Sequence, residues 1–590
     1  MNNNNDSQSA TVAASDSGTL STNTSKGGFS QTFYVANTME IFERLAWYGF
    51  FALSSIYMTT PVSQGGVGFT DGQRGALQGI IPFFLYLLPV FTGALADRYG
   101  YRKMFLISFA IMAPSYYLLG QAQSFGSFFV AFLMVALGAA CFKPVVVGTI
   151  SRTTDDSNRG IGFGIFYTMI NVGGFLGPLV AGYLRAISWD AVFLMSSIWI
   201  MINFLPALLL YRDPKSQAQV DENKASFGQV ISQAQQVLGN GRFALVIFPC
   251  VLLLMAAGAS WLDYSMAFLA IGIWLVFNLC WQFTSVGIED SEVGESIAWY
   301  RQKATVSNKP FAVYLLLLTG FWAVYNQLFY TMPLYIRDFV DTQDLVAMLA
   351  VFGEGTVNFL AVVNLEALVS EISKLFSSNT LPAEIANQLI HLKVRVPVEE
   401  VNIAFTQFGQ GIAESQAREL AQLWANQYRQ INPEYIINLD FAAIVICQIV
   451  VSLICARFKT INVLVVGVIV FSLGCVVAAF ANSLVAGGTV AVIAVLMMAF
   501  GEMITSPKSQ EYVASIAPKD KAALYMGYYF VSMALGFLFA GLLSGWGYGE
   551  LAKKMNNPEL MWAIFVVIGI VTSFGLLWFN HHYLKETKLR

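Results

Sequence analysis

The sequence predicts an all-α membrane protein made of two six-helix bundles, with a two-helix hairpin between them and a long extracytoplasmic insertion. Composition is the first observation, because 56% of the 590 residues are hydrophobic and only 12% are charged, against about a quarter charged in soluble proteins. The second is that apolar runs of about 20 residues, the length at which a helix crosses a bilayer, recur along the chain.

Charge and reactive residues exclude several classes of protein. The 33 basic and 36 acidic residues give a net charge of -3, so no basic field is available for nucleic acid. With three histidines in the chain, we expect no histidine-based metal site. The chain also has no HExxH, GxSxG or GxxxxGK[ST] pattern, so we expect neither an enzyme nor an ATP-driven pump.

The chain begins with a polar tail, residues 1–28, which is rich in Asn, Ser and Thr. A basic start followed by a short apolar core, as in a signal peptide, is missing, so we expect a disordered cytoplasmic tail. After it, we expect an N-terminal bundle (29–212), linkers with an inserted hairpin (213–308, hairpin 243–284), a C-terminal bundle (309–580) and a cytoplasmic tail (581–590). The fourteen predicted spans lie at 34–58, 75–96, 104–121, 127–150, 161–185, 190–211, 243–260, 263–284, 309–334, 435–457, 461–481, 486–506, 523–546 and 560–580.

Positive charge predicts the orientation, because Lys and Arg concentrate in cytoplasmic loops. If both termini are cytoplasmic, the short outer loops hold only Arg74, Arg185, Lys553 and Lys554 of the 33 basic residues. We therefore expect a multi-pass protein of the cytoplasmic membrane with both termini inside.

Residues 335–434 interrupt the second bundle and are expected to face outward. This segment has helical patches such as 413–430, and an apolar stretch, 345–368, that Glu354 and Glu366 interrupt. One alternative is that 345–368 spans the membrane. A segment this long usually has a role of its own or is disordered, so an unknown binding partner for it is a further alternative.

Charged residues inside predicted spans are costly and need an explanation. The first span holds Glu40, Glu43 and Arg44, which share one helix face, and Tyr48 extends that face. Two carboxylates beside one guanidinium leave one acid without a full partner, so this acid can carry a proton. The alternative is an ion pair that only packs helices.

Three further charges lie in later spans. Lys143 in the fourth span has Glu40 or Glu43 as candidate partners, unless its side chain reaches the membrane surface. Glu502 lies near the inner end of its predicted span, so an interfacial position is its alternative. Asp440 either lines a water-filled cavity or caps irregular backbone near Pro433.

Two sets of motifs resemble known families. GALADRYGYRK at 93–103, with Asp97 and Arg98, resembles the signature between helices 2 and 3 of the major facilitator superfamily. EIFERLAWYG at 40–49 resembles the ExxERFxYYG motif of the proton-dependent oligopeptide transporter (POT) family. Further patterns similar to that family's follow in order: FKP at 142–144, FYTMINVG at 166–173, FWAVYNQ at 321–327, INP at 431–433 and GEMITSP at 501–507.

This resemblance implies a symporter that imports di- and tripeptides, driven by the proton gradient without a cofactor, by alternating access between the two bundles. It implies that Glu40, Glu43 and Arg44 couple the proton, and that Lys143 pairs with one of these acids and binds the substrate carboxylate. The positions that it assigns to the substrate site are Tyr48, Tyr86, Asn171, Asn326, Asn432 and Glu502, with Glu502 holding the amino group.

Two positions depart from the family pattern. Phe51 stands where peptide transporters of this family usually carry a second arginine, and Asn326 stands where they carry an acid. One cation and one anion are thus missing together. A proton-coupled carrier of another small solute is therefore the first alternative, and a receptor or docking protein that uses 335–434 is the second.

Overall fold

The computed structural model of the chain describes residues 28–155, 158–214, 240–285, 298–306, 308–378, 380–408, 411–518 and 522–584. The predicted tail 1–28 falls almost wholly outside these residues, as do most of the two linkers and residues 585–590. Within the described ranges, the regular structure is helical apart from isolated β-bridges such as the one between Val394 and Arg429.

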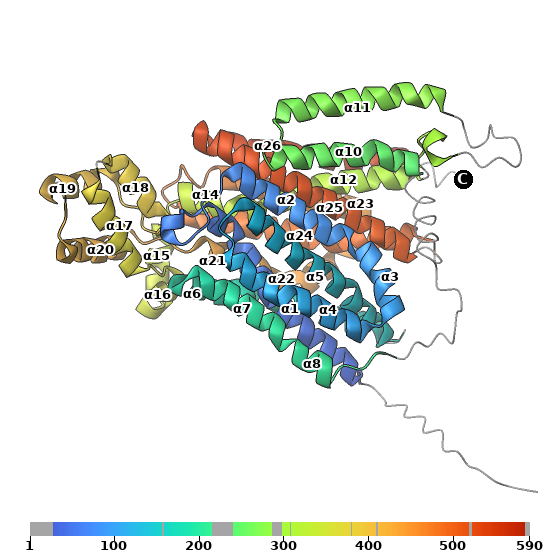
Figure 1. The fold of residues 1–590 in the computed structure, drawn as a ribbon, viewed down its shortest axis with the longest axis horizontal. Helices are drawn as coiled ribbons and strands as arrows, with labels where there is room; N and C mark the ends of the chain where they lie inside the picture. The colour runs from blue at the N-terminus through green and yellow to red at the C-terminus, as the bar shows by residue number, and fades with distance from the viewer. Residues whose placement is uncertain are drawn as a thin grey trace, which may run out of the picture.

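Helices of the two bundles run side by side, and the hairpin packs on their flank (Figure 1). The N-terminal half comprises α1 (Gln31–Thr59), α2 (Asp71–Leu87), α3 (Pro89–Tyr99), α4 (Tyr101–Gln121), α5 (Phe125–Arg152), α6 (Arg159–Ile187), α7 (Trp189–Ile202) and α8 (Phe204–Leu209). The hairpin is α10 (Gly241–Gly258) and α11 (Tyr264–Thr284). The C-terminal half comprises α12 (Lys309–Tyr325), α13 (Gln327–Tyr330), α14 (Met332–Phe339), α21 (Pro433–Ile437), α22 (Leu439–Cys455), α23 (Thr460–Ala479), α24 (Gly487–Ile516), α25 (Ala522–Trp546), η4 (Gly547–Lys554), α26 (Pro558–Phe579) and η5 (Asn580–Leu584).

The two halves meet along α2 and α25, which pack with almost no side chain between them. A Cβ atom on Gly75 would lie 2.4 Å from the carbonyl oxygen of Gly541. Only glycine permits this backbone approach, which is a common way for membrane helices to pack. Small residues thus form part of the interface between the halves.

Twelve helices in the described part of the chain are long and apolar enough to cross a membrane. They correspond to all the predicted spans except the first two, which contain α1 and α2. α1 carries three charged residues and α2 has 17 residues. The all-helical membrane fold is therefore confirmed, whereas the count of fourteen spans stays a prediction.

The insertion forms a helical unit at one end of the bundles (Figure 1). Its helices are α15 (Gln343–Ala350), α16 (Glu354–Leu360), α17 (Leu365–Ser377), α18 (Pro382–Ile390), α19 (Val398–Phe408) and α20 (Glu414–Tyr428). It has its own core, which includes Leu368, Ile372, Leu389 and Trp424. The alternative that 345–368 spans the membrane is wrong, because this stretch is divided among α15, α16 and α17, and the longest of these has 13 residues.

Candidate functional site

Arg44 holds the charged cluster of α1 together. Its Nε atom lies 3.2 Å from Oε1 of Glu40, and its guanidinium also contacts Glu43. All three side chains are buried: Glu40 is 3% exposed, Glu43 is 0% exposed and Arg44 is 5% exposed. Oε2 of Glu40 and Oε1 of Glu43 find no hydrogen-bond partner among the described residues, so each acid keeps one oxygen available for a proton.

α6 packs tightly behind this cluster. A Cβ atom on Gly173 would come within 2.5 Å of Cβ of Arg44, so the glycine of the FYTMINVG segment permits the contact between α1 and α6. Asn171 of the same segment is 6% exposed, and its amide donates to the carbonyl of Tyr167 at 2.8 Å.

Lys143 of α5 lies near the cluster without an ion pair to it. Its Nζ atom is 4.1 Å from the ring centroid of Tyr86, and its electrostatic neighbours are Arg44, Glu43 and Glu40. Among the ion pairs of the described residues, none joins Lys143 to Glu40 or Glu43; both acids pair with Arg44. The lysine is therefore close to the acids but forms an ion pair with neither of them.

Tyrosine side chains from both halves gather around Glu502. Tyr167 of α6 keeps 38% of its surface exposed, yet its electrostatic neighbours include Glu502 and Asp440 of the other half. Tyr167 is therefore close to both acids of the other half. Tyr48 and Tyr325 are also partly exposed, and both interact electrostatically with Glu502.

Glu502 lies about halfway along α24, because this helix runs ten residues beyond the predicted end of its span. Glu502 is therefore not at the end of its helix, and the interfacial alternative for it stays a prediction. Its carboxyl group is 8% exposed and within reach of the Tyr325 hydroxyl and the Asp440 carboxyl. Asp440 is fully buried, and because neither of its oxygens accepts a hydrogen bond of normal geometry, it caps no backbone.

The two departures from the family pattern are buried. Phe51 is 4% exposed, and its ring centroid lies 5.8 Å from that of Phe329 and 5.7 Å from that of Tyr330. Asn326 is fully buried at the end of α12, where its amide donates to the carbonyl of Trp322 at 2.7 Å. Phe51 thus forms apolar contacts between the halves.

Asn432 lies apart from the charged cluster, where the insertion returns to the bundle. Its backbone amide donates to the carbonyl of Leu360 at 2.9 Å, and both polar atoms of its buried side chain find no partner among the described residues.

Residues 93–103 join α3 to α4 through Gly100, whose φ of 93° favours glycine. Arg98 lies over the ring of Tyr99 at 5.7 Å, and the structure does not describe the side chain of Asp97. Asp213 Oδ1 accepts from the backbone amide of Arg102 at 2.8 Å, a contact that sequence reasoning missed.

Polar contacts between the halves gather at the insertion end, and sequence reasoning missed these as well. Arg185 of α6 forms an ion pair of 2.9 Å with Glu434 of α21. Arg74 of α2, which is fully buried, donates to the carbonyl of Tyr330 at 3.1 Å and to Oγ of Ser544 at 3.0 Å. The sequence signal that could have found Arg74 and Arg185 is that basic residues are rare in outer loops, so each one there needs a partner. These contacts hold the halves together at this end.

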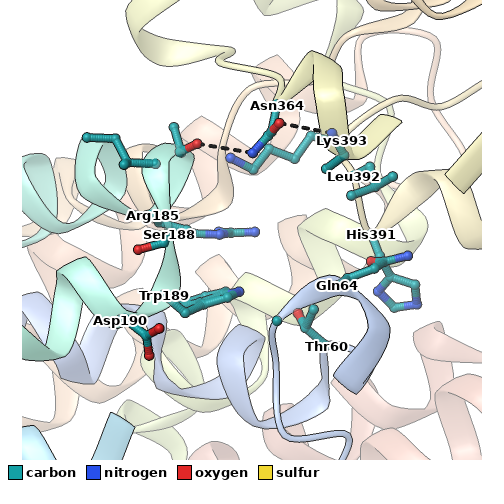
Figure 2. A pocket seen from close by; sticks show the side chains of 14 residues that line it. Thr60, Gln64, Arg185, Ser188, Trp189, Asp190, Asn364, His391, Leu392 and Lys393 are labelled. Atoms are coloured by element: carbon teal, nitrogen blue, oxygen red, sulfur yellow. Dashed lines mark hydrogen bonds between the residues drawn. The ribbon is translucent and has the colours of Figure 1, made fainter. Parts of the chain in front are cut away.

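A cavity of about 250 Å³ lies beside the Arg185–Glu434 pair, between α6, α7 and the insertion (Figure 2). Arg185 and Trp189 line it from the bundle, and His391 and Lys393 line it from the insertion. Burial, and then the charge of Arg337, lowers the pKa of His391 to about 4. Burial, and then the charge of Arg185, lowers the pKa of Lys393 to about 7.

Comparison with known proteins gives matches to membrane transporters. The family model described as Major Facilitator Superfamily matches residues 40–275 and 431–589, which leaves out the insertion. The peptide transporter YePEPT of Yersinia enterocolitica is 30% identical over 230 residues, which cover 37% of this chain and 43% of the relative. A di-/tripeptide transporter of Lactococcus lactis is 29% identical over 148 residues, which cover 24% of this chain and 30% of the relative. The matches thus span less than half of these relatives.

Solved structures resemble most of the chain. The crystal structure of a POT family transporter in complex with 5-aminolevulinic acid has a TM-score of 0.59 and 16% identity, with 94% of this chain and 96% of that one covered. The crystal structure of peptide transporter POT in complex with sulfate has a TM-score of 0.58 and 17% identity, with 93% and 94% covered. At these identities the likeness shows the fold.

Proposed function

We propose that this chain is a proton-coupled symporter that imports small peptides. It belongs to the major facilitator superfamily, and its relatives point to the POT family of that superfamily. It would lie in the cytoplasmic membrane with both termini inside, and its two halves would expose the site to each side in turn. The single observation that carries the proposal is the buried cluster of Glu40, Glu43 and Arg44, in which each acid keeps one unpartnered oxygen.

Proton uptake follows from the charges of this cluster. When Glu40 or Glu43 takes a proton, the acids attract Lys143 less strongly, because one negative charge has gone. Lys143 is then available for the carboxylate of a substrate. After the substrate leaves, the lysine again stabilises the ionised acids and favours release of the proton on the other side.

The ends of a short peptide match two groups on opposite halves. Lys143 of α5 suits the carboxylate, and Glu502 of α24, with Oε2 unpartnered, suits the amino group. A substrate that binds both groups stabilises the state in which the halves are closed around it. Tyr48, Tyr86 and Asn171 would line the site between these ends.

Uptake into vesicles tests this proposal. Purified protein in lipid vesicles should accumulate labelled di- or tripeptide when the outside is more acidic than the inside, and a protonophore should abolish accumulation. If peptide enters at the same rate with and without the gradient, proton coupling fails; if no peptide enters, the substrate class fails.

A carrier of another small solute is the second candidate, and the buried Phe51 and Asn326 favour it because neither offers a charge to a peptide. One of the similar structures holds 5-aminolevulinic acid, which supports this candidate. A thermal-shift screen of peptides and other small solutes separates the two, because a bound ligand stabilises the folded state by RT ln(1 + [L]/Kd).

A further inference from the structure

Two carboxyl groups lie side by side in the C-terminal half, on helices that pack directly against each other. Asp440 is on α22 and Glu502 is on α24, and the two helices pack through Ala443, Ile444, Ala499 and Met503. The carboxyl groups are close enough to influence each other, although their geometry falls short of a regular hydrogen bond. The proton coupling proposed above uses Glu40 and Glu43 and assigns nothing to Asp440.

The pair differs from the α1 cluster in having no cation. Groups that interact with it are hydroxyls: Tyr48 of α1, Tyr167 of α6, Tyr325 of α12 and Tyr529 of α25. Among the described residues, no Lys, Arg or His contributes to the surroundings of either carboxyl group. The α1 cluster, by contrast, has Arg44 in contact with both of its acids.

The two acids also differ in access. Glu502 is 8% exposed and lies among the tyrosines, whereas Asp440 is fully buried. Both oxygens of Asp440 and Oε2 of Glu502 find no hydrogen-bond partner among the described residues. Two adjacent carboxylates without a counter-charge repel each other strongly away from water, so the stable state of such a pair holds a proton.

We infer that Asp440 and Glu502 hold one proton between them and form a second proton-carrying site, separate from Glu40 and Glu43. The inference rests on the proposed function for its place in transport. When the halves close and exclude water from the site, two carboxylates must be neutralised by two positive charges. A cationic group of the substrate at Glu502 supplies one, and the proton supplies the other.

The proton therefore travels with the substrate. A carboxylate oxygen takes the proton from a hydronium ion on the acidic side and leaves water behind. When the site opens to the other side, the carboxyl O–H bond breaks and a water molecule accepts the proton. Asp440 raises the number of coupled protons by one, while the α1 cluster operates as before.

Infrared difference spectroscopy tests whether the pair holds a proton. Spectra of the wild type and of each variant are compared for the full-length protein in lipid, without substrate. The wild type should show a C=O stretch of a protonated carboxyl group that Asp440→Asn removes. Asp440→Ser, which removes the acid with a smaller side chain, should do the same. Glu511→Gln, an exposed acid on the same helix as Glu502, is the control and should keep the signal. An identical carboxyl signal in wild type and both Asp440 variants overturns the inference, whether or not the protein transports peptides.

Accumulation in vesicles tests the coupling. Asp440→Asn should accumulate substrate about tenfold less per unit of pH gradient, because each coupled proton contributes one factor of ten. Exchange of labelled for unlabelled substrate without a gradient should persist, and Asp440→Glu should restore accumulation.

Three results overturn the inference: equal accumulation by wild type and Asp440→Asn, equal loss of exchange and accumulation, or the same loss in Glu511→Gln. If no peptide accumulates but the infrared signal depends on Asp440, the proposed function fails and the proton pair stands.

Discussion

Charge balance at single residues distinguishes the two ends of the site. In the N-terminal half, Glu40 and Glu43 face two cations, because Arg44 contacts both and Lys143 lies nearby. In the C-terminal half, Asp440 and Glu502 face hydroxyl groups. The two halves therefore differ in what must arrive from outside to neutralise them.

Removing one acid of the α1 cluster should separate transport from its driving force. We expect Glu43→Gln to lower accumulation under a proton gradient by about tenfold or more per pH unit, because the site loses the group that carries the proton. Exchange of labelled for unlabelled substrate should continue, because the residues assigned to the substrate remain. Uptake assays in vesicles measure both quantities.

The exposed Glu384 provides the matched control, and Glu384→Gln should behave as wild type. If Glu40→Gln and Glu43→Gln both leave gradient-driven uptake unchanged, the coupling role of this cluster is wrong.

Restoring the arginine that the family usually carries should destabilise this chain. Phe51 is 4% exposed among Trp47, Phe329 and Tyr330, so Phe51→Arg would bury a charge against rings. An unpaired buried charge costs about 3 kcal/mol or more. A thermal melt should therefore show a large loss of stability for Phe51→Arg and a smaller loss for Phe51→Leu. A stable Phe51→Arg protein with tighter peptide binding would contradict this expectation.

At the scale of helices, local sequence predicted what lies along one element, and pairing between elements had to come from the structure. The charges of α1 share a face because of helical spacing alone, so their cluster could be predicted. The Asp440–Glu502 pair depends on how α22 packs against α24, which no spacing in the sequence encodes. Arg185 and Glu434 are 249 positions apart, and only the packing of one half against the other brings them together.

The end of α24 was predicted too early for a related reason. Hydropathy marks the apolar part of a helix, whereas α24 continues ten residues past it through Pro507 and Lys508. The structure accommodates Lys508 because its Nζ atom pairs with Glu511 at 2.7 Å. Helix ends that carry such pairs are hard to locate from apolar runs.

Where the insertion meets the bundle, stability should depend on pH through Lys393. Its pKa in the folded chain is about 7, below the ordinary value of 10.5, because of burial and the nearby Arg185. Between these two values the unfolded chain binds a proton that the folded chain has released, so the free energy of unfolding rises with pH across this window. Lys393→Met removes this rise.

The stability advantage of Lys393→Met over wild type should therefore be largest at pH 7 and below, and it should shrink towards pH 10. Melting temperatures across this range measure it. His391 does not interfere, because its pKa of about 4 keeps it neutral throughout. A constant difference between the two proteins would contradict the assignment to Lys393.

At the scale of the whole molecule, the part of the insertion from α17 to α20 keeps a core separate from that of the bundles, whereas α16 contributes Val357 to the bundle core. Leu368, Ile372 and Trp424 pack with other residues of the insertion, whereas the bundle core extends through both halves. The chain leaves and re-enters the bundle at nearly one point, because the Asn432 amide bonds the Leu360 carbonyl at 2.9 Å. Units joined in this way usually tolerate removal.

Replacing residues 362–429 with a short Gly-Ser linker should therefore leave a folded carrier. We expect gradient-driven uptake within about twofold of wild type, because the deletion removes neither the α1 cluster nor Glu502 and closes the chain across a gap that is already short. Size-exclusion chromatography and uptake in vesicles measure folding and function separately. The outcome that would instead assign the insertion to gating is a folded variant that still exchanges substrate but no longer closes at the insertion end. A cysteine introduced at Thr59, the last residue of α1, would then be labelled more readily from the outer side. A folded variant with full transport that loses a binding partner would favour the docking alternative for this segment.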